Sequence, residues 1–185
     1  MDFFEIKDKV IAEIKNTLST IKNKEVKRLV EALLSAEKVF VAGAGRSMLM
    51  IQTFAKRLNH LGIDVHVVGE TVEPPATKKD LLIVASGSGE SIFPLELAKV
   101  AKRIGTPVAL ITARKESRIA RVADITIYIP APTRLGSSKE AKSSQPLGNL
   151  FEQSLLLFCD VVAMLVQKKK KLSNEELLRY HTNLD

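Results

Sequence analysis

The sequence predicts an α/β protein, a three-layer α/β/α sandwich built around a five-stranded parallel sheet. Short apolar runs rich in β-branched residues alternate along the chain with segments of helical periodicity. Strands that are joined by helical crossovers lie parallel, and a parallel sheet is covered by helices on both faces. The predicted strands are 38–42, 64–68, 80–85, 107–111 and 124–129.

The helices are predicted from apolar residues spaced three and four apart and from signals at their ends. Gly62 and Gly105 directly follow helical patterns, where glycine is a typical stop signal. Ser173 and Glu176 form a capping-box pattern at the start of a last helix. The predicted helices are 3–18, 24–35, 47–61, 91–104, a short one near 117–122, 149–168 and 173–181.

Length and cysteine content predict a single domain in a reducing compartment. A chain of 185 residues can bury one substantial core, with little room for a second domain. The expected domain spans 1–185, with two N-terminal helices before the first strand and a C-terminal helical extension. Cys159 is the one cysteine, so no internal disulfide can form, and no leader is evident. We therefore expect a cytoplasmic protein.

Neither a membrane nor nucleic acid is an expected partner. The longest apolar stretch, 155–166, is shorter than a bilayer span and contains Asp160. The formal charge of +7 includes one dense run of lysines, 168–171, at a helix end where cations complement the helix dipole. Only 5% of the residues are aromatic and none is tryptophan, so base-stacking platforms are not evident.

Two Gly/Ser-rich turns each follow a predicted strand and lead into a predicted helix. They are 43–47, with the sequence GAGRS, and 86–91, with the sequence SGSGES. A helix start offers unpaired N–H groups and a positive dipole end, while glycine lets a ligand approach and serine adds hydroxyl donors. Both turns fall at the carboxyl edge of the sheet, where ligands bind in such folds. They predict a site for a phosphorylated polyol.

The spacing within the two turns argues against the common nucleotide motifs. Met48 occupies the position of the third glycine of a dinucleotide turn, and no acidic residue clearly closes the second strand at Val68. The second turn lacks the lysine of a Walker A motif. Arg46 beside a helix start favours an anionic ligand. Ser47 can either cap the helix or bind the ligand, and the sequence leaves both open.

The chain resembles the sugar isomerase (SIS) domain family over nearly its whole length. The resemblance rests on the segments VFVAGAGRS, LLIVASGSGES, TPVALIT and SSQPLGNLFEQ. FAKRLNHLG, VGETVEPPATKKDLLIV and QPLGNLFEQ look like the hexulose phosphate isomerase branch of that family. Glu73 and Lys79 depart from the expected pattern, and Ser91 replaces a threonine but keeps the hydroxyl. The resemblance implies a flavodoxin-like SIS fold and a homotetramer.

The resemblance implies interconversion of 3-hexulose 6-phosphate and fructose 6-phosphate through an enediol, in the ribulose monophosphate route of formaldehyde fixation or pentose phosphate supply. It also implies that no metal or organic cofactor is needed, and the scattered histidines and lone cysteine show no metal-ligand spacing. One carboxylate can remove the C2 proton and reprotonate C3. Two alternatives stay open: another phosphosugar aldose–ketose isomerase, and a non-catalytic sugar-phosphate sensor, although no basic helix-turn-helix is evident.

Glu152 and His60 are the candidate catalytic residues. Glu152 follows a Pro/Gly/Ser-rich loop over 130–148, and the resemblance places the family's proton acceptor there, although glutamate is also common in a first helical turn. His60 taken alone suits a helix C-terminus, and the resemblance implies that it reaches the site of a neighbouring subunit. Glu90 has a structural alternative, complementing the helix dipole. The candidate substrate-binding residues are Gly45, Arg46, Ser47, Ser86, Gly87, Ser88, Gly89, Glu90 and Ser91.

Overall fold

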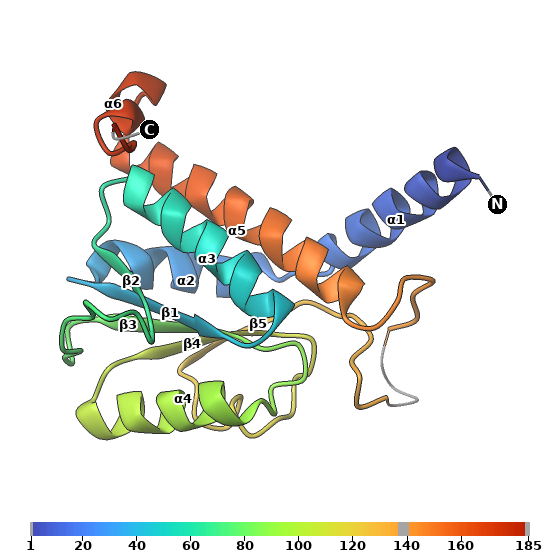
Figure 1. The fold of residues 1–185 in the computed structure, drawn as a ribbon, viewed down its shortest axis with the longest axis horizontal. Helices are drawn as coiled ribbons and strands as arrows, with labels where there is room; N and C mark the ends of the chain where they lie inside the picture. Colours follow the sequence, from blue (N-terminus) through green and yellow to red (C-terminus); the bar gives the residue numbers. More distant parts are fainter. Residues whose placement is uncertain (1, 137–140, 184–185) are drawn as a thin grey trace.

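A computed structural model describes residues 2–136 and 141–183 and has the predicted α/β architecture (Figure 1). All five strands are parallel and form one sheet in the order β2-β1-β3-β4-β5. This is the strand order of flavodoxin-like doubly wound folds. The strands are β1 (Val39–Gly43), β2 (Val65–Val67), β3 (Leu81–Ala85), β4 (Val108–Thr112) and β5 (Ile125–Tyr128).

Six helices of the described residues match predicted ones, and one predicted helix is wrong. The helices are α1 (Phe3–Leu18), α2 (Asn23–Ser35), α3 (Arg46–His60), α4 (Ile92–Ile104), α5 (Asn149–Lys170) and α6 (Asn174–Leu178). The segment predicted as a short helix, 117–122, consists of a bend and turns instead. The hydroxyl of Ser117 accepts the N–H of Ala120 at 3.2 Å, as the side chain of an N-cap does, but the residues that follow form turns and no α-helix.

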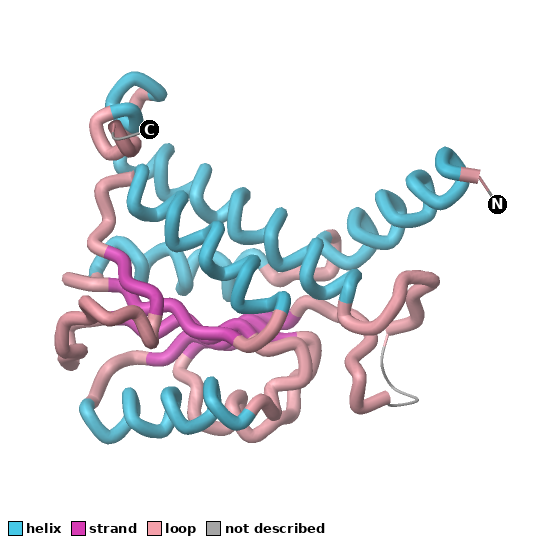
Figure 2. The backbone as a smooth tube through the Cα atoms, viewed as in Figure 1, coloured by secondary structure: helices cyan, strands magenta, loops and turns pink. Residues whose placement is uncertain are grey.

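Two unequal layers of helices cover the sheet (Figure 2). Helices α2, α3 and α5 pack on one face, against alternate strand residues such as Val41 and Ile83. Helix α4 packs on the other face, against Phe40, Leu82 and Val84. Successive side chains of a strand point to opposite faces, so both sets must be apolar when both faces are covered. This explains the continuous apolar runs of the central strands.

Helix α5 belongs to the core of this sandwich. Among the described residues it is the one helix long and apolar enough to cross a bilayer by length and composition, and half of its most apolar window is buried. It lies beside α3, and its own residues Leu155, Phe158 and Val162 are buried in the hydrophobic core. Buried core helices can be equally long and apolar, and α5 packs as such a core helix.

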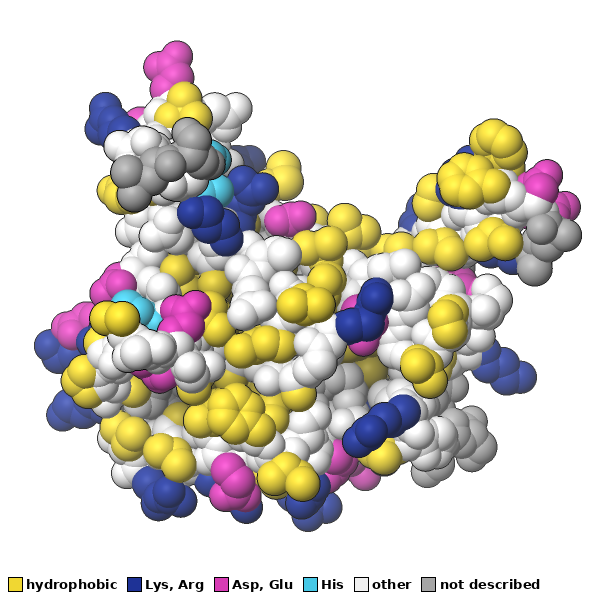
Figure 3. Space-filling model, in the orientation of Figure 1, with side chains coloured by type: hydrophobic (Ala, Val, Ile, Leu, Met, Phe, Trp, Pro, Cys, Tyr) yellow, Lys and Arg dark blue, Asp and Glu magenta, His cyan; other side chains and the backbone are white. Residues whose placement is uncertain are grey.

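Helix α1 projects from the body of the molecule (Figure 1). Its outer end carries apolar side chains, including Phe3 and Phe4, which are 72% and 65% exposed (Figure 3). Its inner end is tied to the body, because the hydroxyl of Thr17 donates to the carbonyl of Pro130 at 3.3 Å. The chain after Pro130 leads towards the start of α5, so the base of α1 lies near the carboxyl edge of the sheet.

The chain segments after β1, β3 and β5 emerge at one edge of the sheet, together with the starts of α3, α4 and α5 (Figure 1). This common edge follows from the parallel direction of the strands. It brings the two Gly/Ser turns together with the segment that precedes α5, as the sequence predicts.

Candidate active site

A cleft of about 380 Å³ opens at this edge. Its volume falls within the range of roughly 300–1,000 Å³ that is usual for small-molecule sites. Three segments bound it, one after β1, one after β3 and one between β5 and α5. Its lining residues are Ala44, Gly45, Arg46, Ser47, Gly87, Ser88, Ser91, Pro132, Thr133, Arg134, Leu147, Gly148, Phe151 and Glu152.

The first turn, between β1 and α3, leaves its polar groups turned towards the cleft. Gly45 is the N-cap of α3 and has φ +55° and ψ −137°, a conformation that residues with a side chain rarely adopt. Ser47 is the second residue of the helix and makes no capping bond, so the capping interpretation of Ser47 is wrong. Within the described part of the chain its hydroxyl has no hydrogen-bond partner. That hydroxyl is therefore available to a ligand.

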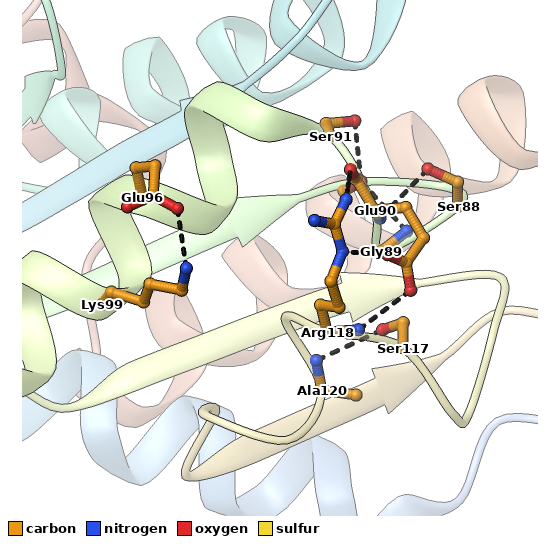
Figure 4. Close-up of polar contacts among 10 residues, drawn as sticks. Ser88, Gly89, Glu90, Ser91, Glu96, Lys99, Ser117, Arg118 and Ala120 are labelled. Atoms are coloured by element: carbon orange, nitrogen blue, oxygen red, sulfur yellow. Dashed lines mark hydrogen bonds and ion pairs between the residues drawn. The ribbon is translucent and has the colours of Figure 1, made fainter.

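The second turn, between β3 and α4, closes on itself through its serine hydroxyls (Figure 4). The hydroxyl of Ser86 accepts the N–H of Gly89 at 3.1 Å and lies 3.1 Å from the hydroxyl of Ser91. The hydroxyl of Ser88 accepts the N–H of Glu90 at 3.2 Å. Ser88 and Ser91 line the cleft, whereas Ser86 is buried beneath it.

Glu90 is not among the residues that line the cleft, and its carboxylate bonds to Arg118 (Figure 4). Its carboxylate accepts the backbone N–H of Arg118 at 2.9 Å and pairs with the guanidinium Nε, while its carbonyl accepts Nη2 at 2.9 Å. Burial on its own raises the pKa of the Glu90 carboxyl, but these bonds outweigh it and leave the pKa below its ordinary value. Glu90 precedes the N-cap Ser91, so its predicted place in the first helical turn is wrong.

Ser86, Gly89 and Glu90 therefore do not reach the surface of the cleft, although all three were expected to bind substrate. They act on the site indirectly, because their bonds fix the turn that presents Ser88 and Ser91. The remaining predicted binding residues, together with Glu152, lie on the cleft wall.

Glu152 and Arg46 form an ion pair at the mouth of the cleft. Nε of Arg46 donates to Oε2 of Glu152 at 2.5 Å, and Nη2 of Arg46 donates to the side-chain oxygen of Asn149 at 3.1 Å. The Glu152 side chain is 16% exposed and that of Arg46 is 61% exposed. A carboxylate so placed, at the edge of the cleft yet largely shielded from water, can take a proton from a bound ligand and return it.

Several cleft residues were not singled out by the sequence. Arg134 makes no hydrogen bond or ion pair with the described residues, so its charge is free to meet an anion. Leu147 has φ +52° and is 80% exposed. A bulky residue in this left-handed region is unusual, and such strain occurs preferentially at functional sites. The sequence predicts a functional role for the Pro/Gly/Ser-rich loop over 130–148, but the loop has no periodicity that would single out residues within it.

His60 lies at the far end of α3 from the cleft. The helix has 15 residues, so at about 1.5 Å per residue its two ends are roughly 20 Å apart. The ring of His60 stacks on that of His181 at 5.1 Å. Burial and the nearby charges of Lys56 and Arg57 lower the pKa of His60. The structure does not bring His60 to the cleft of its own chain, and its catalytic role stays a prediction that requires a neighbouring subunit.

The described residues contain no cluster of three or more His, Cys, Asp or Glu side chains that could hold a metal ion. The cleft offers instead hydroxyl groups, backbone N–H groups, two guanidinium groups and one carboxylate. These groups suit an anionic, hydroxyl-bearing ligand.

Comparison with known proteins identifies the family. The SIS domain matches residues 32–158 of this chain. The chain belongs to the SIS domain family. It is 41% identical to the 3-hexulose-6-phosphate isomerase of Bacillus subtilis over 176 residues, which cover 95% of each chain. It is 36% identical over 173 residues to that of Mycobacterium gastri, covering 94% of this chain and 86% of the relative.

A solved structure of a hypothetical protein from Methanococcus jannaschii, from which the function of a 3-hexulose-6-phosphate isomerase was inferred, matches with a TM-score of 0.84. The two chains are 33% identical, and the match covers 98% of this chain and 99% of that one. The predicted family and fold are thereby confirmed. These SIS relatives support an isomerase that acts on a phosphosugar.

Proposed function

We propose that this SIS-domain protein interconverts 3-hexulose 6-phosphate and fructose 6-phosphate through an enediol, in the ribulose monophosphate route. The observation that carries the proposal is the position of the Glu152 carboxylate, on the wall of the same cleft as the starts of α3 and α4. The choice of substrate is supported by the relatives from Bacillus subtilis and Mycobacterium gastri, which are named 3-hexulose-6-phosphate isomerase and align over nearly the whole chain.

In this proposal the hydroxyl groups of Ser47, Ser88 and Ser91 bind the phosphate and the sugar hydroxyls. Backbone N–H groups at the helix starts add donors, and the dipoles of α3 and α4 favour the negative charge. The absence of a partner for the Ser47 hydroxyl within the described residues supports this role. Arg134, which also lines the cleft, supplies a further cation.

Glu152 moves the proton in this proposal. Its carboxylate takes the proton from C2 of 3-hexulose 6-phosphate, and the electrons of the C2–H bond form the C2=C3 double bond as the carbonyl oxygen at C3 takes up the negative charge. The neighbouring O2 hydroxyl passes its proton to O3, which becomes the hydroxyl at C3. The carboxylic acid then returns its proton to C3, while the electrons on O2 form the new carbonyl at C2. Atoms and charges balance, since the product is an isomer of the substrate.

We also propose that the protein is a cytoplasmic homotetramer in which His60 of one subunit serves the cleft of another. The exposed apolar side chains of α1 and of the outer face of α5 support burial against other copies. Phe3 and Phe4 on α1 are accompanied on α5 by Val161 and Met164, which are 52% and 67% exposed. The distance of His60 from its own cleft is consistent with action in another subunit.

The substitution Glu152→Gln tests this proposal, with Asp160→Asn on the same helix as the matched control. In an assay that couples fructose 6-phosphate formation to a detectable product, we expect Glu152→Gln to lower kcat by about 10²- to 10⁴-fold, the usual contribution of a general base. Binding of fructose 6-phosphate, measured by calorimetry, should persist. Full turnover by Glu152→Gln would exclude Glu152 as the base, and binding without conversion by the unmodified protein would indicate a sensor.

A further inference from the structure

A continuous chain of hydrogen bonds connects the ion pair at the cleft to helix α1. Nη2 of Arg46 donates to Oδ1 of Asn149 at 3.1 Å. Nδ2 of Asn149 donates to Oε1 of Gln145 at 2.9 Å, and Nε2 of Gln145 donates to Oε2 of Glu13 at 3.0 Å. Glu13 lies in the third turn of α1, so this chain of hydrogen bonds joins two regions that are far apart in the sequence.

The direction of this chain is fixed by its two ends. The guanidinium of Arg46 can only donate, and an ionised carboxylate at Glu13 can only accept. The amides of Asn149 and Gln145 must each therefore present oxygen towards Arg46 and nitrogen towards Glu13. Turning either amide over would place two donors or two acceptors face to face, which leaves partly buried polar groups unpaired.

Glu13, at the acceptor end of this chain of hydrogen bonds, is held in place by further hydrogen bonds. Glu13 accepts the hydroxyl of Ser143 at 2.5 Å and both the N–H and the hydroxyl of Ser144 at 2.8 Å. Burial alone raises the pKa of the Glu13 carboxyl, but these bonds and that of Gln145 lower it to about 2. Glu13 is thus ionised throughout the neutral range. Gln145 is only 9% exposed, so water competes little for its amide.

Arg46 needs such support, because its side chain is 61% exposed and a free arginine loses considerable rotamer entropy on being fixed. Its bond from Nε to Glu152 fixes one edge of the guanidinium, and Asn149 fixes a second nitrogen of the same planar group. Two bonds on a rigid plane define its orientation, and hence where the partner carboxylate lies.

We propose that Asn149 is a positioning residue for the isomerisation, and that Glu13 and Gln145 hold it, so that the docking of α1 sets the orientation of Arg46 and of the Glu152 carboxylate. This inference rests on the proposed role of Glu152 as the base. Neither Glu13, Gln145 nor Asn149 lines the cleft, so none of them needs to touch the sugar. Their effect falls on proton transfer more than on binding.

The first test compares Asn149→Leu with Glu13→Ala, using Asp8→Ala as the matched control, since it removes an exposed carboxylate from the same helix. A misplaced carboxylate costs catalysis without removing binding groups, so kcat should fall about 10- to 100-fold with KM nearly unchanged. The double variant of Asn149 and Glu13 should be no worse than the single ones, because both break one connected chain. Asp8→Ala should keep the kcat of the unmodified protein.

The second test uses Asn149→Asp, which still accepts from Arg46 but adds a negative charge near Glu152. A second carboxylate disfavours ionisation of the first, so the acidic limb of the pH profile of kcat should move to higher pH. That shift follows from the added charge alone, so the deciding readout is kcat at the pH optimum of the variant. Asn149→Asp also loses the N–H donor to Gln145, so a positioning role predicts a kcat about 10-fold lower there, whereas a purely structural role lowers only the thermal midpoint or the active fraction. This variant also keeps the test decisive if Asn149→Leu fails to fold.

The outcomes separate this inference from the proposed function. If Glu152→Gln is inactive while Asn149→Leu and Glu13→Ala keep full kcat and Asn149→Asp keeps the kcat of the unmodified protein at its pH optimum, the positioning role is overturned and the base survives. If Glu152→Gln retains full turnover, the base assignment fails and this inference fails with it. Independent, multiplying losses in the double variant would likewise contradict one connected chain.

Discussion

The two Gly/Ser turns have the same strand–turn–helix plan but use their polar groups in opposite ways. In the turn of 43–47, Ser47 has no partner among the described residues, and Arg46 reaches across the cleft to α5. In the turn of 86–91, the serine hydroxyls bond within the turn, and Glu90 holds Arg118. The first turn is open towards a ligand, whereas the second forms a rigid wall beside it.

The glycines of the two turns show the same contrast. Both have positive φ, +55° at Gly45 and +65° at Gly89. A Cβ added at Gly45 would meet nothing within 4 Å, whereas at Gly89 it would lie 2.1 Å from the hydroxyl oxygen of Ser117. Glycine is therefore needed at Gly45 for backbone conformation alone, and at Gly89 for close packing as well. Similar motifs thus serve different physical purposes.

Substituting these glycines should give the largest effect on stability. Gly89→Ala combines backbone strain with a severe clash and should lower the free energy of unfolding by about 2–4 kcal/mol. Gly45→Ala carries the strain alone and should cost about 1–2 kcal/mol. Urea denaturation measures both. Adding Ser117→Gly should recover part of the loss in Gly89→Ala, and equal losses in the two single variants would contradict the difference between the turns.

Alanine substitutions of one serine in each turn should separate binding from stability. Ser86→Ala removes one of the two acceptors of the Gly89 N–H, which also donates to the Ser86 carbonyl, and should lower the free energy of unfolding by roughly 0.5–1.5 kcal/mol. Ser47→Ala should change stability by less than about 0.5 kcal/mol. It should instead raise KM about tenfold, as expected for a lost hydrogen bond to a charged ligand. An unchanged KM in Ser47→Ala would show that this turn does not bind the substrate.

The smallest effect concerns the acid sensitivity of the second turn. The pKa of Glu90 is lowered in the folded state. The stabilisation that its ionised carboxylate gives the fold is therefore complete above the pKa of Glu90 in the unfolded chain, and it is lost as the pH falls towards the pKa of Glu90 in the folded protein. The Arg118 and Glu90 side chains are 52% and 27% exposed, which limits the contribution to about 1 kcal/mol or less. Glu90→Gln should therefore be slightly less stable at pH 7 and lose less stability between pH 5 and pH 3. Identical pH curves would contradict this.

Much of the fold is predictable because it depends on local patterns. The alternation of apolar strands and amphipathic helices is visible in single segments, and parallel strands then place their carboxyl ends together. The sequence also singled out Glu152 and the two turns. What it could not predict depends on contacts between distant residues. Glu90 is paired with Arg118, 28 residues later, and no local pattern reveals that bond.

The same limit applies elsewhere in the site. Arg134 lies in an aperiodic segment, so nothing in its neighbourhood distinguishes it from other surface arginines. In the segment 117–122, where a short helix is predicted, the N–H groups of Arg118 and Ile119 bond to the carboxylate of Glu90 and to the carbonyl of Gly89, and Ser117 packs against Gly89. The link from Glu13 to Asn149 spans more than a hundred residues and follows from tertiary packing.

The most direct test of the account is hydrogen exchange during turnover in D₂O. The carboxylic acid of Glu152 can exchange its proton with the solvent while the enediol is bound. The unmodified protein, given 3-hexulose 6-phosphate or fructose 6-phosphate, should therefore incorporate deuterium at C2 of 3-hexulose 6-phosphate and at C3 of fructose 6-phosphate, as detected by nuclear magnetic resonance. Glu152→Gln should bind fructose 6-phosphate and incorporate none. Deuterium incorporation by Glu152→Gln at the rate of the unmodified protein would contradict the assignment of Glu152 as the group that moves the proton.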